Sequence, residues 1–340
     1  MTKNKQEILV TGGAGFIGSS FVNLATEHGY KVIVIDKLTY SGNKENLAWI
    51  KDFDLENDFY QADIGDKEIL AEIFSKYQIS KIINFAAESH VDNSINDPSP
   101  FIQSNILGTF ELLQASRRYF EKLSSEQKSE FRFLHISTDE VFGELEETGK
   151  FREDSNYQPN SPYSASKAAS DHLVRAWHQT YKLPILITNC SNNYGPRQHQ
   201  EKLIPTIIAN AINGKDIPIY GDGKNVRDWI FVDDHNLAVL NVLENATIGQ
   251  TYCLGVNNEK NNNQIVHLIC ERLDKLKPLA DSRKYSEQIK YVEDRKGHDK
   301  RYAIDSSKIE QELDFKPKYN FEQAIDLTIK WYLNFFEGKK

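Results

Sequence analysis

Cysteine is scarce in this sequence, and the few cysteines present do not form a framework. Only three of the 340 residues are cysteine, namely Cys190, Cys253 and Cys270, and each lies in an apolar segment far from the others. Disulfide-rich domains and zinc sites use cysteines that are numerous or closely spaced. We therefore expect three reduced cysteines that pack in the interior, with no disulfide and no metal site.

Long apolar runs and an excess of positive charge are also absent. The chain lacks the run of about 18 apolar residues that would span a membrane, and residues 1–7 lead into too short an apolar run for a signal peptide. The net charge of -8 excludes the basic face that contacts to nucleic-acid phosphates require. We expect a cytoplasmic protein that binds neither a membrane nor nucleic acid, with only local phosphate sites.

A glycine-rich turn follows the first apolar segment. Residues 8–10 read as a short strand, and Gly12, Gly15 and Gly18 come next, before a helical pattern that ends at Gly29. Such glycines permit a tight turn, close approach of the backbone to a pyrophosphate at the helix N-terminus, and close packing of helix on strand. The spacing is G-x-x-G-x-x-G, and by itself it fits an ordinary turn equally well.

An acidic residue ends the next predicted strand. Lys31–Ile35 is apolar and β-branched, and Asp36 follows it, where a carboxylate can accept hydrogen bonds from an adenosine ribose. An acid at this point repels a 2′-phosphate, so the pattern favours NAD over NADP. The alternative is a carboxylate that only caps the strand end.

Strands and helices alternate through the first half of the chain. We expect further strands at 59–62, 81–85, 131–136 and 184–190, helices at 66–77 and 98–120, and a surface loop at 121–130. This alternation predicts an α/β fold built on a Rossmann-like, doubly wound parallel sheet.

From residue 191 the alternation loosens into a smaller, mixed α/β C-terminal lobe. Short strands at 217–220 and 227–230 mix with helices at 202–213, 233–244 and 321–336. We predict that residues 1–190 form an NAD-binding domain. Residues 191–340 should form mainly a substrate lobe, with some chain returning to the sheet. The substrate is then expected between the two parts.

Two adjacent carboxylates follow the apolar segment at 131–136. Asp139 and Glu140 come after Ser137 and Thr138, where a buried strand is expected to end. Neighbouring side chains at such a point face different surroundings, so one carboxyl can stay protonated as an acid while the other stays ionised as a base. The pattern indicates acid–base chemistry.

A tyrosine and a lysine lie one helical turn apart. Ser161 and Pro162 are typical of a helix start, and Tyr163 and Lys167 follow on one face. A tyrosine pKa is ordinarily about 10, and we expect the ammonium and the positive ring of NAD to lower the pKa of Tyr163 until it serves as a base. Without the upstream glycines, such a pair is usually only part of an amphipathic helix.

Cationic residues of the second half are candidates for binding phosphate. Arg227 and Arg295 are assigned to a substrate diphosphate, because guanidinium groups match phosphate oxygens in pairs. The alternative for each is a solvated surface arginine. His298 lies in a polar loop and is a candidate substrate contact, with no further ligands at metal spacing.

Several motifs occur along the chain in a fixed order: Thr11–Gly18, Asp36–Tyr40, Ala86–Asp92, Ser137–Glu140, Tyr163–Lys167, Asn189–Pro196, Glu201–Pro205, Arg227–Trp229 and Gly297–Asp299. Together they resemble the dTDP-glucose 4,6-dehydratases of the extended short-chain dehydrogenase/reductase superfamily, nearly from end to end. The resemblance implies tightly held NAD and conversion of dTDP-glucose to a 4-keto-6-deoxy sugar. In this scheme Tyr163, with Lys167, is the base at C4, Glu140 the base at C5, Asp139 the acid at C6, and Thr138 a hydrogen-bond donor to the C4 oxygen.

The resemblance also implies two binding sets. The cofactor set comprises Gly12, Gly15, Phe16, Ile17, Gly18, Asp36, Lys37, Leu38, Thr39, Asp63, Ile64, Phe85, Ala86, Ala87, Glu88, Ser89, Ser104, Tyr163, Lys167 and Asn193. The substrate set comprises Ser89, Thr138, Asn192, Lys202, Leu203, Pro218, Ile219, Tyr220, Arg227, Asn262, Asp294, Arg295, Lys296, Gly297 and His298. Tyr220 is expected against the pyrimidine.

Other functions remain open at this point. The sequence departs from the family pattern at Asn93, Phe142, Gln200 and Lys296. Because the departures at 200 and 296 lie in substrate segments, a dehydratase of UDP-glucose or UDP-GlcNAc stays an alternative. A UDP-hexose 4-epimerase or decarboxylase on the same fold needs no acid–base pair at C5 and C6, and a non-catalytic NAD sensor needs none of the four reactive residues. The resemblance further implies a homodimer formed by the long helix after Pro98 and the helix of Tyr163.

Overall fold

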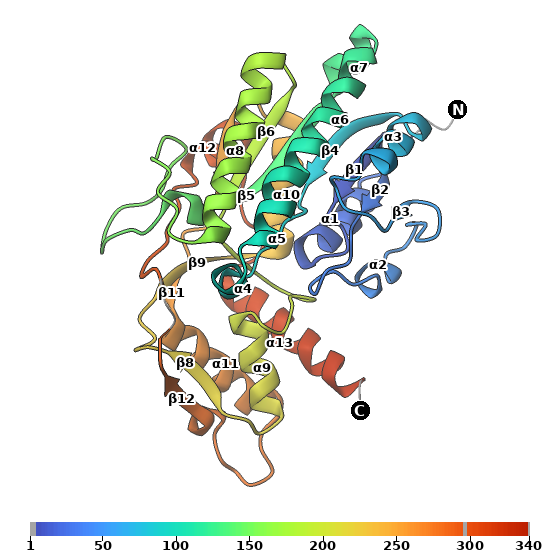
Figure 1. Ribbon diagram of the computed structural model, residues 1–340. Helices are drawn as coiled ribbons and strands as arrows, with labels where there is room; N and C mark the ends of the chain where they lie inside the picture. The colour runs from blue at the N-terminus through green and yellow to red at the C-terminus, as the bar shows by residue number, and fades with distance from the viewer. Residues whose placement is uncertain (1–4, 295–297, 339–340) are drawn as a thin grey trace.

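Seven parallel strands form the main sheet, in the order β10-β6-β5-β4-β1-β2-β3 (Figure 1). The computed structural model describes residues 5–294 and 298–338. Every neighbouring pair of strands is parallel, which confirms the predicted doubly wound sheet. The strands are β1 (Glu7–Thr11), β2 (Lys31–Ile35), β3 (Phe59–Tyr60), β4 (Ile79–Asn84), β5 (Arg132–Thr138), β6 (Ile185–Cys190) and β10 (Thr251–Leu254).

Apolar side chains alternate between two hydrophobic cores, one on each face of this sheet. In β1, Ile8 and Val10 pack into the core on one face and Leu9 into the core on the other, and all three are fully buried. A strand that is covered on both faces has a continuous apolar sequence, so its position can be predicted from the sequence. The first core is covered by α1 (Phe16–Glu27), α2 (Glu45–Ala48), α10 (Val232–Asn245) and α12 (Ser307–Leu313), and the second by α3 (Lys67–Lys76), α6 (Thr109–Lys122) and α8 (Pro162–Tyr181).

The helix predicted from Pro98 is continuous but not uniform. It starts as α5 (Ser99–Phe101), passes through a π-helical segment η1 (Ile102–Gly108) and continues as α6. The prediction of a surface loop at 121–130 is wrong for the second half of this segment, which forms the helix α7 (Ser125–Glu130). Ser124 and Gln127 make a reciprocal capping box that starts this polar helix, a signal that the low apolar content of the segment masked.

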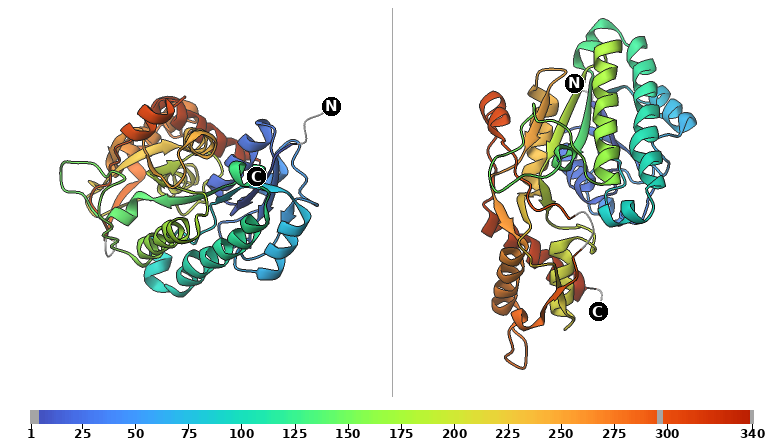
Figure 2. Two further views of the ribbon diagram at one scale, coloured as in Figure 1. Left: turned by 90° about the horizontal axis from the view of Figure 1, so that it is seen from above. Right: turned by 60° about the vertical axis from the view of Figure 1, so that its left-hand side comes forward.

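A smaller lobe with its own core adjoins the sheet at one end (Figure 2). Its three-stranded sheet has the order β11-β9-β7, and a separate parallel pair joins β8 to β12. The strands are β7 (Asn192–Tyr194), β8 (Ile217–Tyr220), β9 (Val226–Phe231), β11 (Glu259–Asn261) and β12 (Ile289–Val292), and the helices are α9 (Leu203–Ile212), α11 (Asn262–Leu276), η3 (Tyr285–Gln288) and α13 (Phe321–Glu337).

The later half of the chain also completes the main sheet. After β9, helix α10 packs against α1, and β10 then pairs with β6 as the outermost strand. The remaining short elements are α4 (Val91–Asn96) and η2 (Asp139–Phe142), which follow β4 and β5. Within the described residues, none of the helices has the length and apolar character needed to cross a membrane.

Candidate active site

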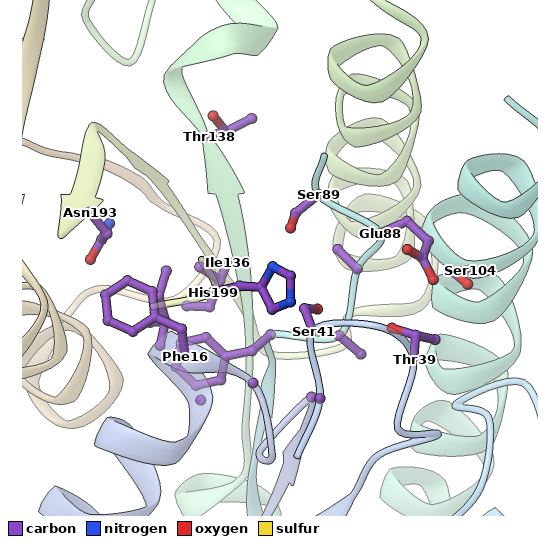
Figure 3. Close-up of a pocket in the computed structure, with 18 of the residues that line it drawn as sticks. Phe16, Thr39, Ser41, Glu88, Ser89, Ser104, Ile136, Thr138, Asn193 and His199 are labelled. Atoms are coloured by element: carbon purple, nitrogen blue, oxygen red, sulfur yellow. The ribbon is translucent and has the colours of Figure 1, made fainter. Parts of the chain in front are cut away.

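A cleft lies at the carboxyl ends of the main-sheet strands. The sheet order reverses between β1 and β4, and ligands of doubly wound sheets bind at such a point. The cleft has a volume of about 290 Å³ and is lined by segments from both halves of the chain. Figure 3 shows Thr138 at the tip of β5, Glu88 and Ser89 from the loop after β4, and Asn193 from β7, around the same cavity.

The glycine turn after β1 forms one wall of this cleft. Gly12 has a φ of +66°, and a Cβ on it would lie 2.7 Å from the main-chain nitrogen of Ala86. A Cβ on Gly18 would lie 2.2 Å from the main-chain oxygen of Gly12. Helix α1 starts here without a side-chain cap, and its first residues, Phe16, Ile17 and Gly18, line the cleft. The turn therefore has the close backbone approach that a dinucleotide pyrophosphate needs.

Asp36 caps the end of β2 and also lines the cleft. Its side chain accepts hydrogen bonds from the main-chain nitrogens of Ala14 (3.0 Å) and Leu38 (2.8 Å), as a strand-end cap does. It also lines the cleft, where a ribose would meet it. Burial raises the pKa of Asp36, and the two N–H donors oppose this rise.

A charged cluster lines part of the cleft. The ammonium of Lys37 donates to the hydroxyl of Ser104 and lies 3.3 Å from Asp63 and 3.8 Å from Glu88. Burial raises the pKa of Glu88, and the charge of Lys37 acts against it. The cluster joins four of the predicted cofactor residues from separate segments of the chain.

Asp139 is held in a strongly desolvating position at the end of β5. It begins the short helix η2, and only 2 % of its surface is exposed. Its Oδ2 atom is buried without a hydrogen-bond partner among the described residues. Burial, followed by the charge of Glu140, raises the pKa of Asp139 well above its ordinary value. Asp139 is thus suited to be the protonated member of the predicted pair.

Tyr163 and Lys167 face the same cleft from the first turns of α8. Ser161 caps this helix through the main-chain nitrogen of Ser164, and Pro162 is its first residue, as predicted. The expected lowering of the Tyr163 pKa is not found in the protein alone. Burial and the charge of Glu140 raise the pKa of Tyr163 well above its ordinary value. The ammonium of Lys167 donates instead to the main-chain oxygen of Ile136, 2.8 Å away.

The cleft gathers all five predicted catalytic residues and most of the predicted cofactor set. Of the latter, only Leu38 is absent from the lining, because its side chain packs against the core while its nitrogen bonds Asp36. The predicted substrate residues are divided. Ser89, Thr138, Asn192 and Lys202 line the cleft, whereas Leu203, Pro218, Ile219, Tyr220, Arg227, Asn262, Asp294 and His298 belong to the smaller lobe outside it. Arg295, Lys296 and Gly297 lie outside the described residues.

Several substrate-set residues have surroundings that limit how they can act. The Arg227 guanidinium is buried and donates to the main-chain oxygens of Val226, Asp299 and Lys300. Ile219 is buried in the smaller lobe's core, so only its main chain can meet a ligand. His298 lies 2.7 Å from a carboxylate oxygen of Asp294. Tyr220, by contrast, is well exposed.

Some lining residues did not stand out in the sequence. A stretch after β7 reaches back over the cleft, where His199 meets the ring of Tyr40 edge-on and Glu201 lies near both His90 and His199. The polar character of this stretch was a usable signal, but its contacts with Tyr40 and His90 are to segments distant in the sequence. The lining residues that were assigned no role are Ser41, Gly42, Ala62, Ile136, Ser137, Cys190, Ser191, Gln198, His199 and Glu201. Of these, Ser137, Cys190, Ser191 and Glu201 lie within the motifs noted in the sequence.

The three cysteines are free and buried, as predicted, although Cys190 also lines the cleft. Its thiol donates to the main-chain oxygen of Ser137, and burial raises the pKa of Cys190 to about 12. In the part of the chain that the structure describes, no group of three or more His, Cys, Asp or Glu side chains is placed to hold a metal ion.

Comparison with known proteins places this geometry in a family. A sequence model of the GDP-mannose 4,6 dehydratase family matches residues 9–328. The chain is 54% identical over 325 residues to a dTDP-glucose 4,6-dehydratase of Xanthomonas campestris, covering 96% of this chain and 92% of the relative. It is 51% identical over 338 residues to dTDP-glucose 4,6-dehydratase 1 of Escherichia coli K12, covering 96% and 93%.

Solved structures show the same relation. A dTDP-glucose 4,6-dehydratase of Streptomyces venezuelae, crystallised with NAD, superposes with a TM-score of 0.86 at 41% identity and 97% coverage of both chains. A UDP-glucose 4-epimerase of Thermotoga maritima superposes almost as well, with a TM-score of 0.85 and coverage of 97% and 100%, but at 28% identity. The fold is thus shared with this epimerase, whereas the dehydratases named here share more of the sequence than the epimerase does. The chain belongs to the dTDP-glucose 4,6-dehydratase family.

Proposed function

We propose that this protein is an NAD-dependent dTDP-glucose 4,6-dehydratase, which converts dTDP-glucose to dTDP-4-keto-6-deoxyglucose and water. The observation that carries the proposal is the pair Asp139 and Glu140 at the tip of β5, in the same cleft as the glycine turn and Tyr163. The X. campestris and E. coli relatives carry this name, and the S. venezuelae relative was solved with NAD.

The residues of the cleft fit NAD. The glycine turn and the N-terminus of α1 would hold its pyrophosphate, Asp36 its adenosine ribose, and Tyr163 with Lys167 the nicotinamide side. NAD, when bound, would supply the redox chemistry of the reaction, which is oxidation at C4 and reduction at C6. The positive charge of its ring would act against the burial and carboxylate charge that raise the pKa of Tyr163 in the protein alone.

The side chains then divide the proton transfers. The phenol oxygen of Tyr163 takes the proton of the C4 hydroxyl as that carbon is oxidised to a ketone, and Thr138 donates a hydrogen bond to the C4 oxygen. The ketone acidifies the C5 proton, which Glu140 removes. Asp139, protonated because it is buried beside Glu140, gives its proton to the departing C6 oxygen, so water leaves. After reduction at C6, a proton returns to C5.

The epimerase alternative leaves Asp139 and Glu140 without a use, because epimerisation moves no proton at C5 and expels no group from C6. The choice among nucleotide sugars depends on the smaller lobe. Offering dTDP-glucose, UDP-glucose and UDP-GlcNAc separately and weighing the products by mass spectrometry tests both points. We expect loss of one water from dTDP-glucose at the highest rate. A product of unchanged mass with inverted C4 configuration would instead identify an epimerase.

We also propose a homodimer in the cytoplasm. Ile95 of α4 and Ile102 and Leu107 of η1 are large apolar side chains that remain exposed in the single chain, next to α8. The buried, free cysteines fit a reducing compartment. Sedimentation equilibrium should give twice the chain mass for the wild type and the chain mass for Leu107→Lys. A monomeric wild type at micromolar concentration would contradict the dimer.

A further inference from the structure

A chain of buried polar side chains runs beneath the cleft, from the strand before the glycine turn to helix α8. Thr11 donates to the side-chain oxygen of Asn84 (2.6 Å), and the Asn84 amide nitrogen lies 3.0 Å from Nδ1 of His135. Nε2 of His135 is 3.4 Å from Oδ1 of Asp171. All four residues are almost fully buried. No step of the proposed reaction uses Asn84, His135 or Asp171 directly.

The order of donors and acceptors fixes the state of His135. Because Thr11 occupies the side-chain oxygen of Asn84, the amide nitrogen faces Nδ1 and donates to it. Burial and the charge of Lys167 lower the pKa of His135, so the ring is neutral. A neutral ring that accepts at Nδ1 carries its proton on Nε2, on the side of Asp171.

The carboxylate of Asp171 is surrounded by donors on one oxygen only. Its Oδ2 accepts from Ser137 (2.8 Å), Tyr157 (2.9 Å) and, at 3.4 Å, Asn189. Its Oδ1 has no well-aligned donor among the described residues and faces His135. Burial raises the pKa of Asp171, while these donors and the charge of Lys167 act against the rise.

Lys167 depends on this arrangement. Its Nζ lies 3.4 Å from Nε2 of His135, the same ring nitrogen that lies 3.4 Å from Oδ1 of Asp171, so the ammonium and the carboxylate both meet the imidazole at this nitrogen. Burial lowers the pKa of Lys167, and the negative charge of Asp171 is the largest influence that acts against it. The titratable groups of the elements around Lys167 are Tyr163 and Asp171 of α8, His135 of β5, Cys190 of β6, and Asp139 and Glu140 of η2. The buried polar residues of η1 are Ser104 and Asn105, which do not titrate.

We propose that Asp171 is a positioning residue for the dehydratase reaction, which keeps Lys167 as an ammonium beside Nε2 of His135 and anchors, through Ser137, the strand end that carries Thr138, Asp139 and Glu140. The inference rests on the proposed function, since that function gives Lys167 its role. Asp171 itself does not line the cleft.

The test replaces the charge while preserving the shape, with Asp171→Asn. In this variant the alkaline limb of kcat against pH should move to lower pH by about one unit or more, because Lys167 loses its proton earlier. The KM for the nucleotide sugar should change little. In cofactor-free protein labelled with ¹³C-lysine, the Lys167 signal, assigned with Lys167→Arg, should titrate at correspondingly lower pH. An unchanged alkaline limb and lysine titration in folded Asp171→Asn would overturn the proposal.

Two control variants separate positioning from stability. Tyr157→Phe removes a hydrogen bond to the Asp171 carboxylate and keeps the charge of that carboxylate. Asp234→Asn neutralises a buried carboxylate of α10, which accepts hydrogen bonds from the main-chain nitrogens of Lys318 and Tyr319. Both should lower the melting temperature without moving the alkaline limb. If the alkaline limb moved as far in either control as in Asp171→Asn, the shift would be explained by general destabilisation of the fold.

A reciprocal measurement keeps the proposal testable if Asp171→Asn does not fold. Lys167→Gln removes the ammonium, so the carboxyl signal of Asp171 in ¹³C-aspartate-labelled protein should titrate at higher pH than in the wild type. An unmoved Asp171 titration would show that the two groups are uncoupled. These titrations need neither NAD nor sugar. They stay informative if product analysis rejects dTDP-glucose as the substrate.

Discussion

The tip of β5 and the outer face of the smaller lobe are built in opposite ways. At the tip of β5, Asp139 is 2 % exposed, and Lys167 of α8, which donates to the main-chain oxygen of Ile136 in the same strand, is 3 % exposed. On β8 of the smaller lobe, Tyr220 is 45 % exposed. The first region holds groups whose pKa values depend on exclusion of water, and the second offers accessible surface to a ligand. Changes in the first should therefore act on kcat and changes in the second on KM.

The strongest test of the buried region is Glu140→Gln, which keeps the shape and removes the base. We expect turnover to fall by about 10²–10⁴-fold, while oxidation at C4 still produces bound NADH, visible by its absorbance. Exchange of the C5 proton with deuterium from heavy water should stop. Glu147→Gln, an exposed neighbour in the following loop, is the matched control and should behave as the wild type. Continued C5 exchange in Glu140→Gln would remove this base from the scheme.

Asp139→Asn separates catalysis from stability in the same region. Turnover should fall by about 10²-fold or more, because the acid at C6 is lost. The pKa of Asp139 is higher in the folded than in the unfolded protein, so its contribution to stability is present below the unfolded value and is lost as pH rises through the folded value. The neutral amide has no such loss. Melting curves at pH 5 and 8 should show the variant gaining stability relative to the wild type at the higher pH. A relative loss there would mean that Asp139 is stabilised as an anion.

Asp36 lies between the two extremes, because it is buried yet is proposed to meet a ligand. Asp36→Asn should weaken NAD binding by about 1.5 to 3 kcal/mol and reduce discrimination against NADP, since the repulsion of the 2′-phosphate is lost. Calorimetric titration of cofactor-free protein with each dinucleotide measures both effects. An unchanged ratio of the two affinities would leave Asp36 with only its capping role toward Ala14 and Leu38.

Tyr220→Ala should have the smallest effect, and it should act on KM instead of kcat. If the exposed ring stacks on the pyrimidine, its removal costs about 1 kcal/mol, which is roughly a fivefold increase in KM, with kcat nearly unchanged. Tyr291, exposed on the neighbouring strand β12, provides a control in Tyr291→Ala. A fall in kcat without a rise in KM would break the contrast between the two regions.

The same contrast explains how far the sequence could be read. Buried strands such as 31–35 could be predicted from their continuous apolar residues. The glycines and Asp36 could be interpreted because they directly follow such strands. The direction of the Tyr163 pKa was not predictable, because it depends on burial and on Glu140, which comes from another element. His135 and Asp171 were passed over because isolated polar residues within β5 and α8 give no sign of their mutual contact.

The outermost strand β10 joins the two halves of the chain in the fold, and it also affects when during synthesis the fold can be completed. Residues 1–190 supply six strands of the sheet, but the exposed edge of β6 is covered only when 251–254 arrive, and the core beneath α1 is closed by α10 and α12. A nascent chain released to residue 200 would carry the whole glycine turn and the Tyr163 helix, yet keep an open strand edge and an uncovered apolar face. We therefore expect both faces of the main sheet to be covered only after synthesis has passed the last of these elements, which ends at Leu313.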